Sequence, residues 1–263
     1  MRRLSSRQNP LVARFRDVAR LRDRGDQVLL EGEHLVAEAH AARLPIEIVA
    51  IAENRLASTA GELARRLSAA GVDAVQVPDV VMNALSPTKQ PSGIVAIARF
   101  SPSSVDVVLR AAPQLVVVLA GIQDAGNVGA IVRAADGCGA TGIIATEGTA
   151  DPFGWKALRG AMGSTFRVPI AIHQPLMTTI HRLKQQKVAV VATVPRGGIA
   201  LPDARLAGAT AVVLGSEGAG LLDEIVAAAD ARITIPMRPP VESFNVAITA
   251  ALILYEAGKQ RAG

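Results

Sequence analysis

Cysteine and long apolar runs are scarce in this chain of 263 residues, and each scarcity excludes a class of protein. Cys138 is the only cysteine, so no intramolecular disulfide can form and we expect a reducing compartment. The longest apolar runs, 116–122 and 247–255, are far shorter than a membrane span. The N-terminus is rich in arginine but lacks the apolar region of a secretory signal. The sequence therefore predicts a cytoplasmic protein with no membrane partner.

Aromatic residues and metal-ligand clusters are also scarce. Aromatic side chains make up 3% of the chain, and Trp155 and Tyr255 are each the only residue of their kind. This composition disfavours an aromatic platform for stacking nucleic-acid bases, and we expect Trp155 to be a packing residue. The four histidines lack the spacing of metal ligands, so no metal site is predicted: His34, His40, His173 and His181.

The positive charge is concentrated at the N-terminus. Residues 1–24 carry eight arginines against Asp17 and Asp23, a charge of +6, so residues 25–263 together carry −1 of the formal +5. A basic segment of this kind favours contact with a polyanion such as nucleic acid. A solvated helix face explains the same arginines equally well, so charge alone leaves both interpretations open.

The first hundred residues alternate between strand and helix patterns. Apolar runs predict strands at 27–32, 46–51, 74–78 and 93–100, and helical spacing predicts helices at 33–44 and 60–71. A segment with two prolines and three serines, 101–114, follows them. We therefore expect a small α/β domain over residues 1–103, a linker over 104–112 and a second domain over 113–263.

The second domain has strands rich in valine, isoleucine and alanine that alternate with helices. The predicted strands are 115–122, 142–146, 167–172, 188–194, 210–215 and 231–237. The predicted helices are 127–137, 154–162, 175–186, 219–229 and 243–258. Near-continuous apolar strands between helices are typical of a parallel sheet that is covered on both faces.

Three glycines in the stretch GNVGAIVRAADGCGATG match the G-x-G-x-x-G spacing of a dinucleotide-binding loop. Gly137, Gly139 and Gly142 nevertheless follow a predicted helix and precede a predicted strand, which inverts the order that such a loop requires. The acidic residue that should follow near 157–162 is absent. We therefore expect these glycines to end a helix and turn the chain, and a nicotinamide-dependent enzyme is a remote alternative.

Three loops carry polar residues just beyond strand ends. Asn127 lies where a helix is predicted to start, in a position to cap it, and Arg133 follows six residues later, roughly 120° around the helix. The second loop holds Glu217 among glycines, and the third holds Ser243 and Asn245 at the start of a helix. Ligands of parallel sheets bind beyond the carboxyl ends of the strands, so one composite site is expected. An ordinary capped helix with a surface arginine would explain the first loop alone.

These three motifs, AGNVGAIVRAADGCGA, LGSEGAGL and IPMRPPVESFNVAITAALILYEA, resemble the SpoU (TrmH-like) branch of the SPOUT RNA methyltransferases. The resemblance covers residues 113–263. The earlier part, with LLEGEHLVAEA, resembles a small RNA-binding domain related in fold to kink-turn-binding ribosomal proteins. The resemblance implies a deep trefoil knot, a homodimer, S-adenosylmethionine bound in the knot, and methylation of a ribose 2′-hydroxyl in RNA.

The resemblance also implies roles for individual residues. The catalytic set would be Asn127, Arg133, Glu217, Ser243 and Asn245. The cofactor-binding set would be Thr193, Leu214, Gly215, Ile235, Pro236, Met237 and Phe244. Arg133 would be either the base for the 2′-hydroxyl or a clamp on a phosphate, since a guanidinium normally stays protonated. The sequence departs from the family pattern at Pro239, Phe244, Ala247 and Ala161, which bears on the cofactor loop and the RNA groove.

Three functions follow in order of preference: an RNA ribose methyltransferase, a non-catalytic RNA-binding protein and, last, the nicotinamide-dependent enzyme. The two-domain layout is more similar to rRNA-directed members of the family than to single-domain tRNA enzymes, so rRNA is the expected substrate and tRNA the alternative. A protein of the same fold that binds RNA or assists ribosome assembly without catalysis is the second possibility. The intact motif residues favour an active enzyme.

Overall fold

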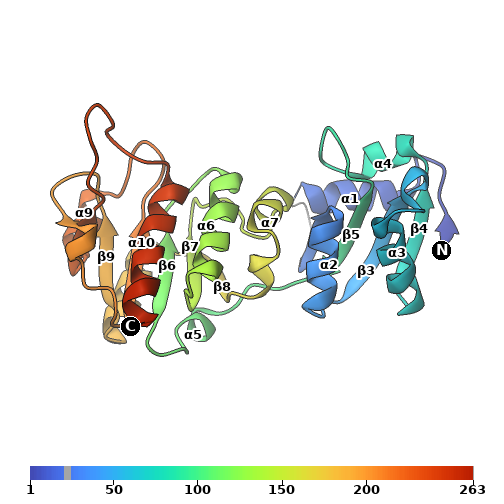
Figure 1. The fold of residues 1–263 in the computed structure, drawn as a ribbon. Coiled ribbons are helices and arrows are strands. Elements are labelled where there is room, and N and C mark those ends of the chain that lie inside the picture. The colour runs from blue at the N-terminus through green and yellow to red at the C-terminus, as the bar shows by residue number, and fades with distance from the viewer. Residues whose placement is uncertain (21–24, 263) are drawn as a thin grey trace. The chain divides into compact units, whose positions relative to one another are not determined.

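The chain forms two compact units in a computed structural model, which describes residues 1–20 and 25–262 (Figure 1). The first unit comprises Met1–Ser101 together with Phe153–Phe166, and the second comprises Pro102–Pro152 together with Arg167–Gly263. A segment from the later half of the sequence therefore folds with the N-terminal residues. Among the described residues, no helix is long and apolar enough to cross a membrane.

The first unit contains a mixed sheet of five strands in the order β1-β4-β3-β5-β2. The strands β1, β4 and β3 run parallel, whereas β5 is antiparallel to both β3 and β2. As a result, β2, β3 and β4 all end at the edge of the sheet where β5 begins. The bounds are β1 Arg2–Arg3, β2 Gln27–Glu31, β3 Ile46–Ala52, β4 Asp73–Val77 and β5 Ile94–Arg99.

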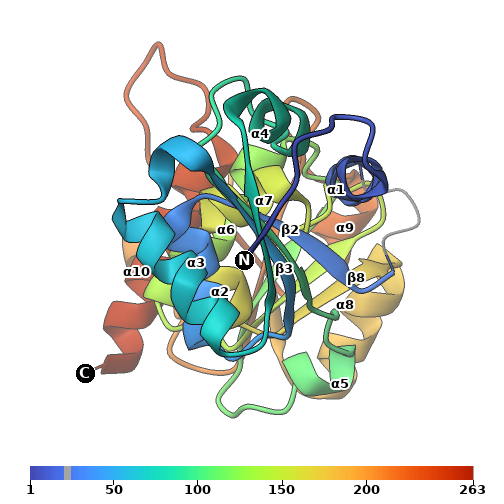
Figure 2. The same cartoon turned by 90° about the vertical axis from the view of Figure 1, so that its right-hand side faces the viewer.

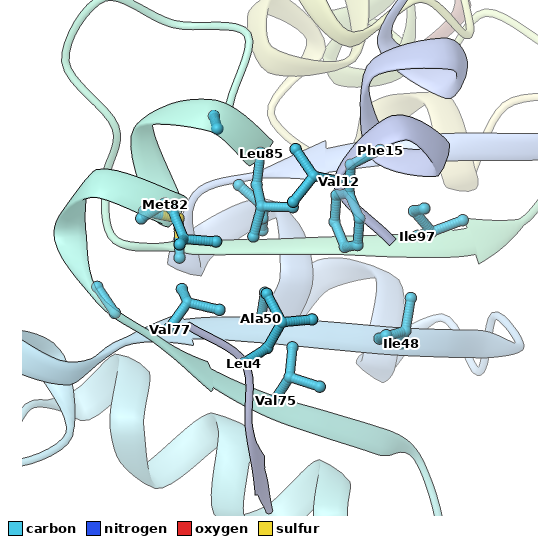
Figure 3. Close-up of a cluster of buried hydrophobic side chains, with 14 of the residues drawn as sticks. Leu4, Val12, Phe15, Ile48, Ala50, Val75, Val77, Met82, Leu85 and Ile97 are labelled. Atoms are coloured by element: carbon cyan, nitrogen blue, oxygen red, sulfur yellow. The ribbon is translucent and has the colours of Figure 1, made fainter. Parts of the chain in front are cut away.

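Helices cover both faces of this sheet (Figure 2). On one face lie α1 (Pro10–Ala19) and α4 (Asp79–Leu85), and on the other lie α2 (Glu33–Ala41) and α3 (Thr59–Ala69). Phe15 of α1 and Leu85 of α4 are almost fully buried against Ile48 and Ile97 of the sheet (Figure 3). Burial of these apolar side chains stabilises the unit.

The sequence analysis missed α1 and α4. A start signal for α1 is present in the sequence, because Asn9 accepts a hydrogen bond from the Leu11 N–H at 2.9 Å and Pro10 occupies the first turn. The arginines of this segment obscured the helical spacing of Val12, Phe15 and Val18, which form the buried face of α1. Arg22, Asp23 and Arg24 of the basic N-terminal segment lie outside the described residues.

The segment Phe153–Phe166 completes the first unit. Its helix α7 (Trp155–Ala161) packs against β2, and Trp155 packs against the apolar core shared by α1 and α4. The prediction that Trp155 is a packing residue is therefore confirmed. The rings of Phe153 and Phe166 each lie 5.4 Å from the ring of Phe100, which joins both ends of the segment to the residue after β5.

The second unit contains a sheet of seven strands in the order β10-β12-β9-β11-β6-β7-β8. Every neighbouring pair is parallel, which confirms the predicted parallel sheet. The bounds are β6 Leu115–Leu119, β7 Gly142–Thr146, β8 Ile170–Gln174, β9 Ala189–Thr193, β10 Ile199–Ala200, β11 Thr210–Leu214 and β12 Ala231–Thr234.

Helices cover both faces of this sheet as well, as the sequence predicted. On one face α6 (Ala125–Gly137) and α10 (Val246–Ala262) lie side by side (Figure 1). The other face packs against α5 (Val105–Val108), α8 (Leu176–Gln185) and α9 (Asp223–Ala228), with Val108, Ile180, Leu183 and Ile225 buried. Short α5 and β10 were not predicted.

Three predicted boundaries were wrong because prolines and a glycine turn interrupt the patterns. The strand predicted from 167 begins only after Pro169, and the strand predicted to reach 237 ends before Pro236. Proline cannot donate to a ladder hydrogen bond. The helix predicted from 219 begins at Asp223, because Gly218 and Gly220 hold a turn with φ of +91° and +69°.

The glycines with dinucleotide-loop spacing end a helix, as predicted. The helix α6 ends at Gly137, and Gly139 takes up a φ of +77° in the turn that follows. Gly142 opens β7, where a Cβ atom would lie 2.6 Å from Val108 Cγ1. Close packing of a strand against α5 therefore explains Gly142 without a bound pyrophosphate.

Candidate active site

A cleft of about 450 Å³ lies at the edge of the second unit's sheet where β9, β11 and β12 end. The loops after these three strands and the first turns of α10 form its walls. Eight of the predicted site residues line it: Thr193, Gly215, Glu217, Ile235, Met237, Ser243, Phe244 and Asn245. Leu214 and Pro236 do not, because Leu214 is buried within β11 and Pro236 is exposed on its loop.

The loop after β11 is compact for a steric reason. A Cβ atom on Gly215 would lie 2.6 Å from the Leu221 backbone nitrogen, so only glycine lets the two ends of the loop approach. The Gly220 N–H donates to the Ser216 carbonyl at 3.0 Å and closes the loop. Glu217 is thereby held at the lip of the cleft.

Three polar side chains from three different segments form one hydrogen-bonded row. The Asn127 Nδ2 donates to Glu217 Oε1 at 2.6 Å, and the Asn245 Nδ2 donates to Asn127 Oδ1 at 3.1 Å. The Asn245 Oδ1 in turn accepts from the Ala247 N–H at 2.9 Å at the start of α10. Both ends of the Asn127 amide are therefore used, which fixes the orientation of this side chain.

The expectation that Asn127 caps a helix was wrong. Asp124 is the N-cap of α6, and its Oδ1 accepts from the Asn127 N–H at 2.8 Å. Asn127 is consequently the third residue of the helix, and its side chain is free to meet Glu217. Sequence reasoning missed Asp124, although aspartate is a typical N-cap, whose side chain accepts from the backbone N–H three residues later. Asn245 likewise precedes α10, which begins at Val246.

A second concavity of about 410 Å³ adjoins the first. Five of its six lining residues have polar side chains: Gln123, Asp124, Asn127, Ser216 and Glu217, with Ala219 as the sixth. Ser216 and Glu217 line both concavities. Glu217 therefore stands between the two, with its partner Asn127 on the side of the second.

Arg133 lies apart from this row. It is exposed on α6, six residues or about 9 Å of helix rise beyond Asn127. The structure gives its guanidinium no hydrogen bond and no ion pair to any described residue. Arg133 thus has no ionic partner in the described part of the chain, and neither Glu217 nor Asn245 bonds to it.

The first cleft suits a ligand with one apolar and one polar face. Ile233, Ile235 and Ile253 supply apolar wall, while Ser243 and the backbone of the loop after β11 supply polar groups. A nucleoside joined to a short amino-acid chain has this character, so S-adenosylmethionine fits the residues present. No group of three or more His, Cys, Asp or Glu residues in the described part of the chain could hold a metal ion.

Comparison with known proteins places the chain. Residues 114–255 match the SpoU rRNA methylase family, and residues 12–96 match an MRM3-like substrate-binding domain. A tRNA/rRNA methyltransferase of Synechocystis is 33% identical, over 98% of this chain and 94% of the relative. The 23S rRNA (guanosine(2553)-2′-O)-methyltransferase of Bacillus subtilis is 28% identical, over 97% and 98%.

Solved structures agree with this assignment. The crystal structure of an AdoMet-bound rRNA methyltransferase from Sinorhizobium meliloti is similar to this chain, with a TM-score of 0.83 and 28% identity. The likeness covers 98% of this chain and 97% of that one. Fold and site thus define an α/β protein with a ligand cleft at the carboxyl edge of a parallel sheet. The chain belongs to the SpoU rRNA methylase family, which confirms the resemblance found in its motifs.

Proposed function

We propose that this protein transfers a methyl group from S-adenosylmethionine to a ribose 2′-hydroxyl of rRNA. The observation that carries the proposal is the hydrogen-bonded row of Glu217, Asn127 and Asn245 between two adjoining clefts. One cleft has the character of the cofactor and the other is polar enough for a nucleotide. The names of the relatives, which include 23S rRNA guanosine 2′-O-methyltransferases, support rRNA over tRNA.

The first cleft holds the cofactor in this proposal. When bound, S-adenosylmethionine supplies an electrophilic methyl group on a sulfonium. Ile235 and Phe244 cover its apolar surface, and the backbone of Gly215 with the Ser243 hydroxyl contacts its polar groups. Thr193 lines the cleft but does not donate to the cofactor, because its hydroxyl already donates to the Val213 carbonyl at 3.0 Å. Phe244, which departs from the family pattern, adds apolar surface to this wall.

The polar row orients the ribose and receives its proton. The new bond joins the ribose 2′-oxygen to the methyl carbon while the carbon–sulfur bond breaks, so most of the rate enhancement comes from alignment. The 2′-hydroxyl must also lose a proton. Glu217 is the only carboxylate among the described residues that line the first cleft, and we assign it the role of acceptor. Asn127 then holds the carboxylate in place through its 2.6 Å hydrogen bond.

Arg133 serves as a phosphate clamp in this scheme. A guanidinium stays protonated under ordinary conditions and binds phosphate oxygens in pairs. Its side chain is exposed and has no partner among the described residues, so it is free for a phosphate next to the target ribose.

A homodimer is part of the proposal. Ile248, Leu252 and Tyr255 of α10 are exposed although they are apolar, with 51%, 40% and 68% of their surface accessible. Their spacing of four and three residues puts them on one stripe of the helix. A stripe of this kind beside the cleft is a reason to expect a second copy of the chain there.

The remaining expectations complete the proposal. Residues 1–103 form the RNA-binding domain, 104–112 the linker and 113–263 the methyltransferase domain, in a cytoplasmic protein. The trefoil knot belongs to the proposal as well. It is supported by the meeting of the loops after β9, β11 and β12 at one cleft.

Transfer of a tritiated methyl group tests the function. The protein is incubated with labelled S-adenosylmethionine and either rRNA or tRNA from cells that lack the protein. The expected result is label on rRNA that is attached to a ribose, not to a base, and that maps to one 2′-O-methylated nucleotide. Label on tRNA alone would change the substrate class. RNA binding without transfer to either RNA would favour the non-catalytic alternative and overturn the proposal.

A further inference from the structure

Unpaired cations gather at one edge of the first unit's sheet, where β2 and β3 end. Arg55 follows β3, Lys89 lies in the loop before β5, and Lys156 lies on α7. All three side chains are exposed, and none has a hydrogen bond or ion pair to another described residue. The structure therefore leaves these three charges available to a partner.

These cations are neighbours through a chain of contacts. Lys156 and Arg159 share the exposed face of α7, one turn apart. The Arg159 guanidinium lies 3.7 Å from the buried Glu31 carboxylate, whose other oxygen accepts from the Ser92 N–H at 2.9 Å. The Arg55 side chain lies directly over Gly93, the next residue, where a Cβ would meet it at 2.6 Å. One continuous surface thus carries Arg55, Lys156 and Arg159, and Lys89 lies three residues before Ser92 in the same loop.

The opposite edge of the same sheet is different. There Arg2 pairs with Asp73 at 2.7 Å, Arg99 pairs with Asp26 at 3.1 Å, and Arg14 pairs with Glu47. Four described arginines of the N-terminal segment are therefore engaged within the unit: Arg2, Arg14, Arg3, which pairs with Glu53, and Arg16, which donates to the Ala84 carbonyl. The sequence had pointed to these arginines as the contact for a polyanion. In the structure, the strand-end surface, which carries Arg55, Lys89 and Lys156, is the better candidate for that contact.

We propose that this strand-end surface binds the phosphate backbone of the RNA substrate, and that Phe153–Phe166 completes it. When exposed cations without protein partners bind phosphates, the counterions condensed on the RNA are released, and this release favours binding. Two carboxylates at this edge already face a cation of the unit, since Glu31 lies 3.7 Å from Arg159 and Glu53 lies 2.7 Å from Arg3. They offer little competition for the unpaired cations, whereas Glu33 and Asp79 accept only from the uncharged Thr59 and Asn54.

The surface is built from both halves of the chain. Arg55 and Lys89 come from the segment that matches the substrate-binding domain, whereas Lys156 comes from the segment that matches the SpoU rRNA methylase family. Glu31 and Arg159 position the two contributions against each other. RNA binding would then depend on a segment that a sequence-based division of the chain assigns to catalysis. This inference rests on the proposed function, since it takes RNA as the substrate.

Salt-dependent RNA binding tests the inference in the full-length protein. The triple variant R55A/K89A/K156A removes the three free cations, and R20A/R43A/R66A removes three exposed arginines of the same unit that lie away from this surface. The probe is rRNA transcribed in vitro. We expect the first variant to bind about tenfold more weakly at 150 mM salt and to lower the slope of log K against log[salt] by about two to three.

The controls separate failure of the inference from failure of the proposed function. Binding of S-adenosylmethionine and methyl transfer at saturating RNA should stay near wild-type values in R55A/K89A/K156A, and Trp155 fluorescence reports whether its first unit is folded. Equal weakening in both triple variants, or an unchanged salt slope in the first, would overturn the inference. A wild-type protein that transfers no methyl group to RNA would instead defeat the proposed function itself.

Discussion

At the scale of single residues, the central feature is an amide with both ends engaged. Asn127 donates to Glu217 through its Nδ2 and accepts from Asn245 through its Oδ1, so a change of its amide nitrogen removes the bond to Glu217 and keeps the one from Asn245. Both hydrogen bonds are exposed at the mouth of a cleft, where they position a reacting group more than they stabilise the fold. Substitutions here should therefore affect transfer more than stability.

Asn127→Asp tests this arrangement. The new carboxylate cannot donate to Glu217, and two carboxylates at hydrogen-bond distance repel each other unless one is protonated. We expect at least a 100-fold loss of methyl transfer at pH 8, with partial recovery as the pH falls toward 5. A rate profile between pH 5 and pH 9 measures this. An unchanged rate at pH 8 would show that the row does not position the ribose.

Arg133→Ala and Arg133→Lys test the phosphate clamp. We expect Arg133→Ala to abolish transfer while the Kd for S-adenosylmethionine stays the same, because the side chain makes no contact with the cofactor cleft in this chain. Arg133→Lys should keep a measurable rate with a raised KM for RNA, since an ammonium also binds phosphate. A lysine variant whose rate climbs steadily with pH toward 10 would identify a base instead.

At the scale of elements, α10 carries an apolar stripe that the first unit's helices lack. Ile248, Leu252 and Tyr255 are exposed on a helix whose other side packs against α6 and the sheet. Leu252→Glu should disrupt the proposed homodimer, because a charge in an apolar interface is costly to desolvate. Light scattering after size exclusion should then give the mass of one chain.

A matched control for this change is Val80→Glu on α4. Val80 is 50% exposed and apolar, but it belongs to α4 of the first unit. The control should keep the mass of the wild type. A wild-type protein that is monomeric at micromolar concentration would contradict the dimer outright.

The contribution of Asp230, which lies just before β12 and contacts β9, to the stability of the protein should depend on pH. Partial burial by itself raises the pKa of the Asp230 carboxyl, but the Val190 N–H at 2.8 Å and the Lys184 ammonium at 2.9 Å more than offset this. The pKa of Asp230 in the folded protein therefore lies below its ordinary value. Its contribution to stability is present above the unfolded pKa, about 3.9, and is lost as the pH falls through the lower folded value.

Asp230→Asn measures this contribution. We expect a loss of about 0.5–1 kcal/mol at pH 7, since solvent screens this half-exposed site. The difference from wild type should shrink in thermal unfolding below pH 4. Asp203→Asn, at an exposed aspartate with no hydrogen bond or ion pair to another described residue, should show no such trend.

At the scale of the whole molecule, the two units have separate apolar cores, so a ligand of one need not stabilise the other. Trp155, the only tryptophan, belongs to the first unit, whereas the cofactor cleft belongs to the second. Saturating S-adenosylmethionine at 100 times its Kd should stabilise the second unit by about 2.7 kcal/mol. We expect the denaturation midpoint from circular dichroism to rise while the midpoint from Trp155 fluorescence stays constant. Equal shifts in both signals would mean that the units unfold together.

Much of the architecture could be predicted because the pattern of apolar residues along the chain specifies each strand and helix locally. Runs such as 115–119 and 211–214 are apolar at every position, which only a strand covered on both faces requires, and both strands are parallel and buried. The residues of the polar row were also found, since each follows such a strand or begins the next helix. Boundaries failed where a proline or a left-handed glycine, such as Pro169 or Gly220, ended an otherwise regular pattern.

The sequence by itself determined the two α/β units, the parallel sheet and the identity of the three loops, because burial and backbone preference depend on neighbouring residues along the chain. The tertiary structure decided which side chains meet. The contact between Asn127 and Glu217 spans 90 residues, and the engagement of Arg2 depends on Asp73. It also decided that Phe153–Phe166 folds with the first unit and that Arg55, Lys89 and Lys156 find no partner within residues 1–20 and 25–262. Such pairings are set by distance in space, which no local pattern encodes.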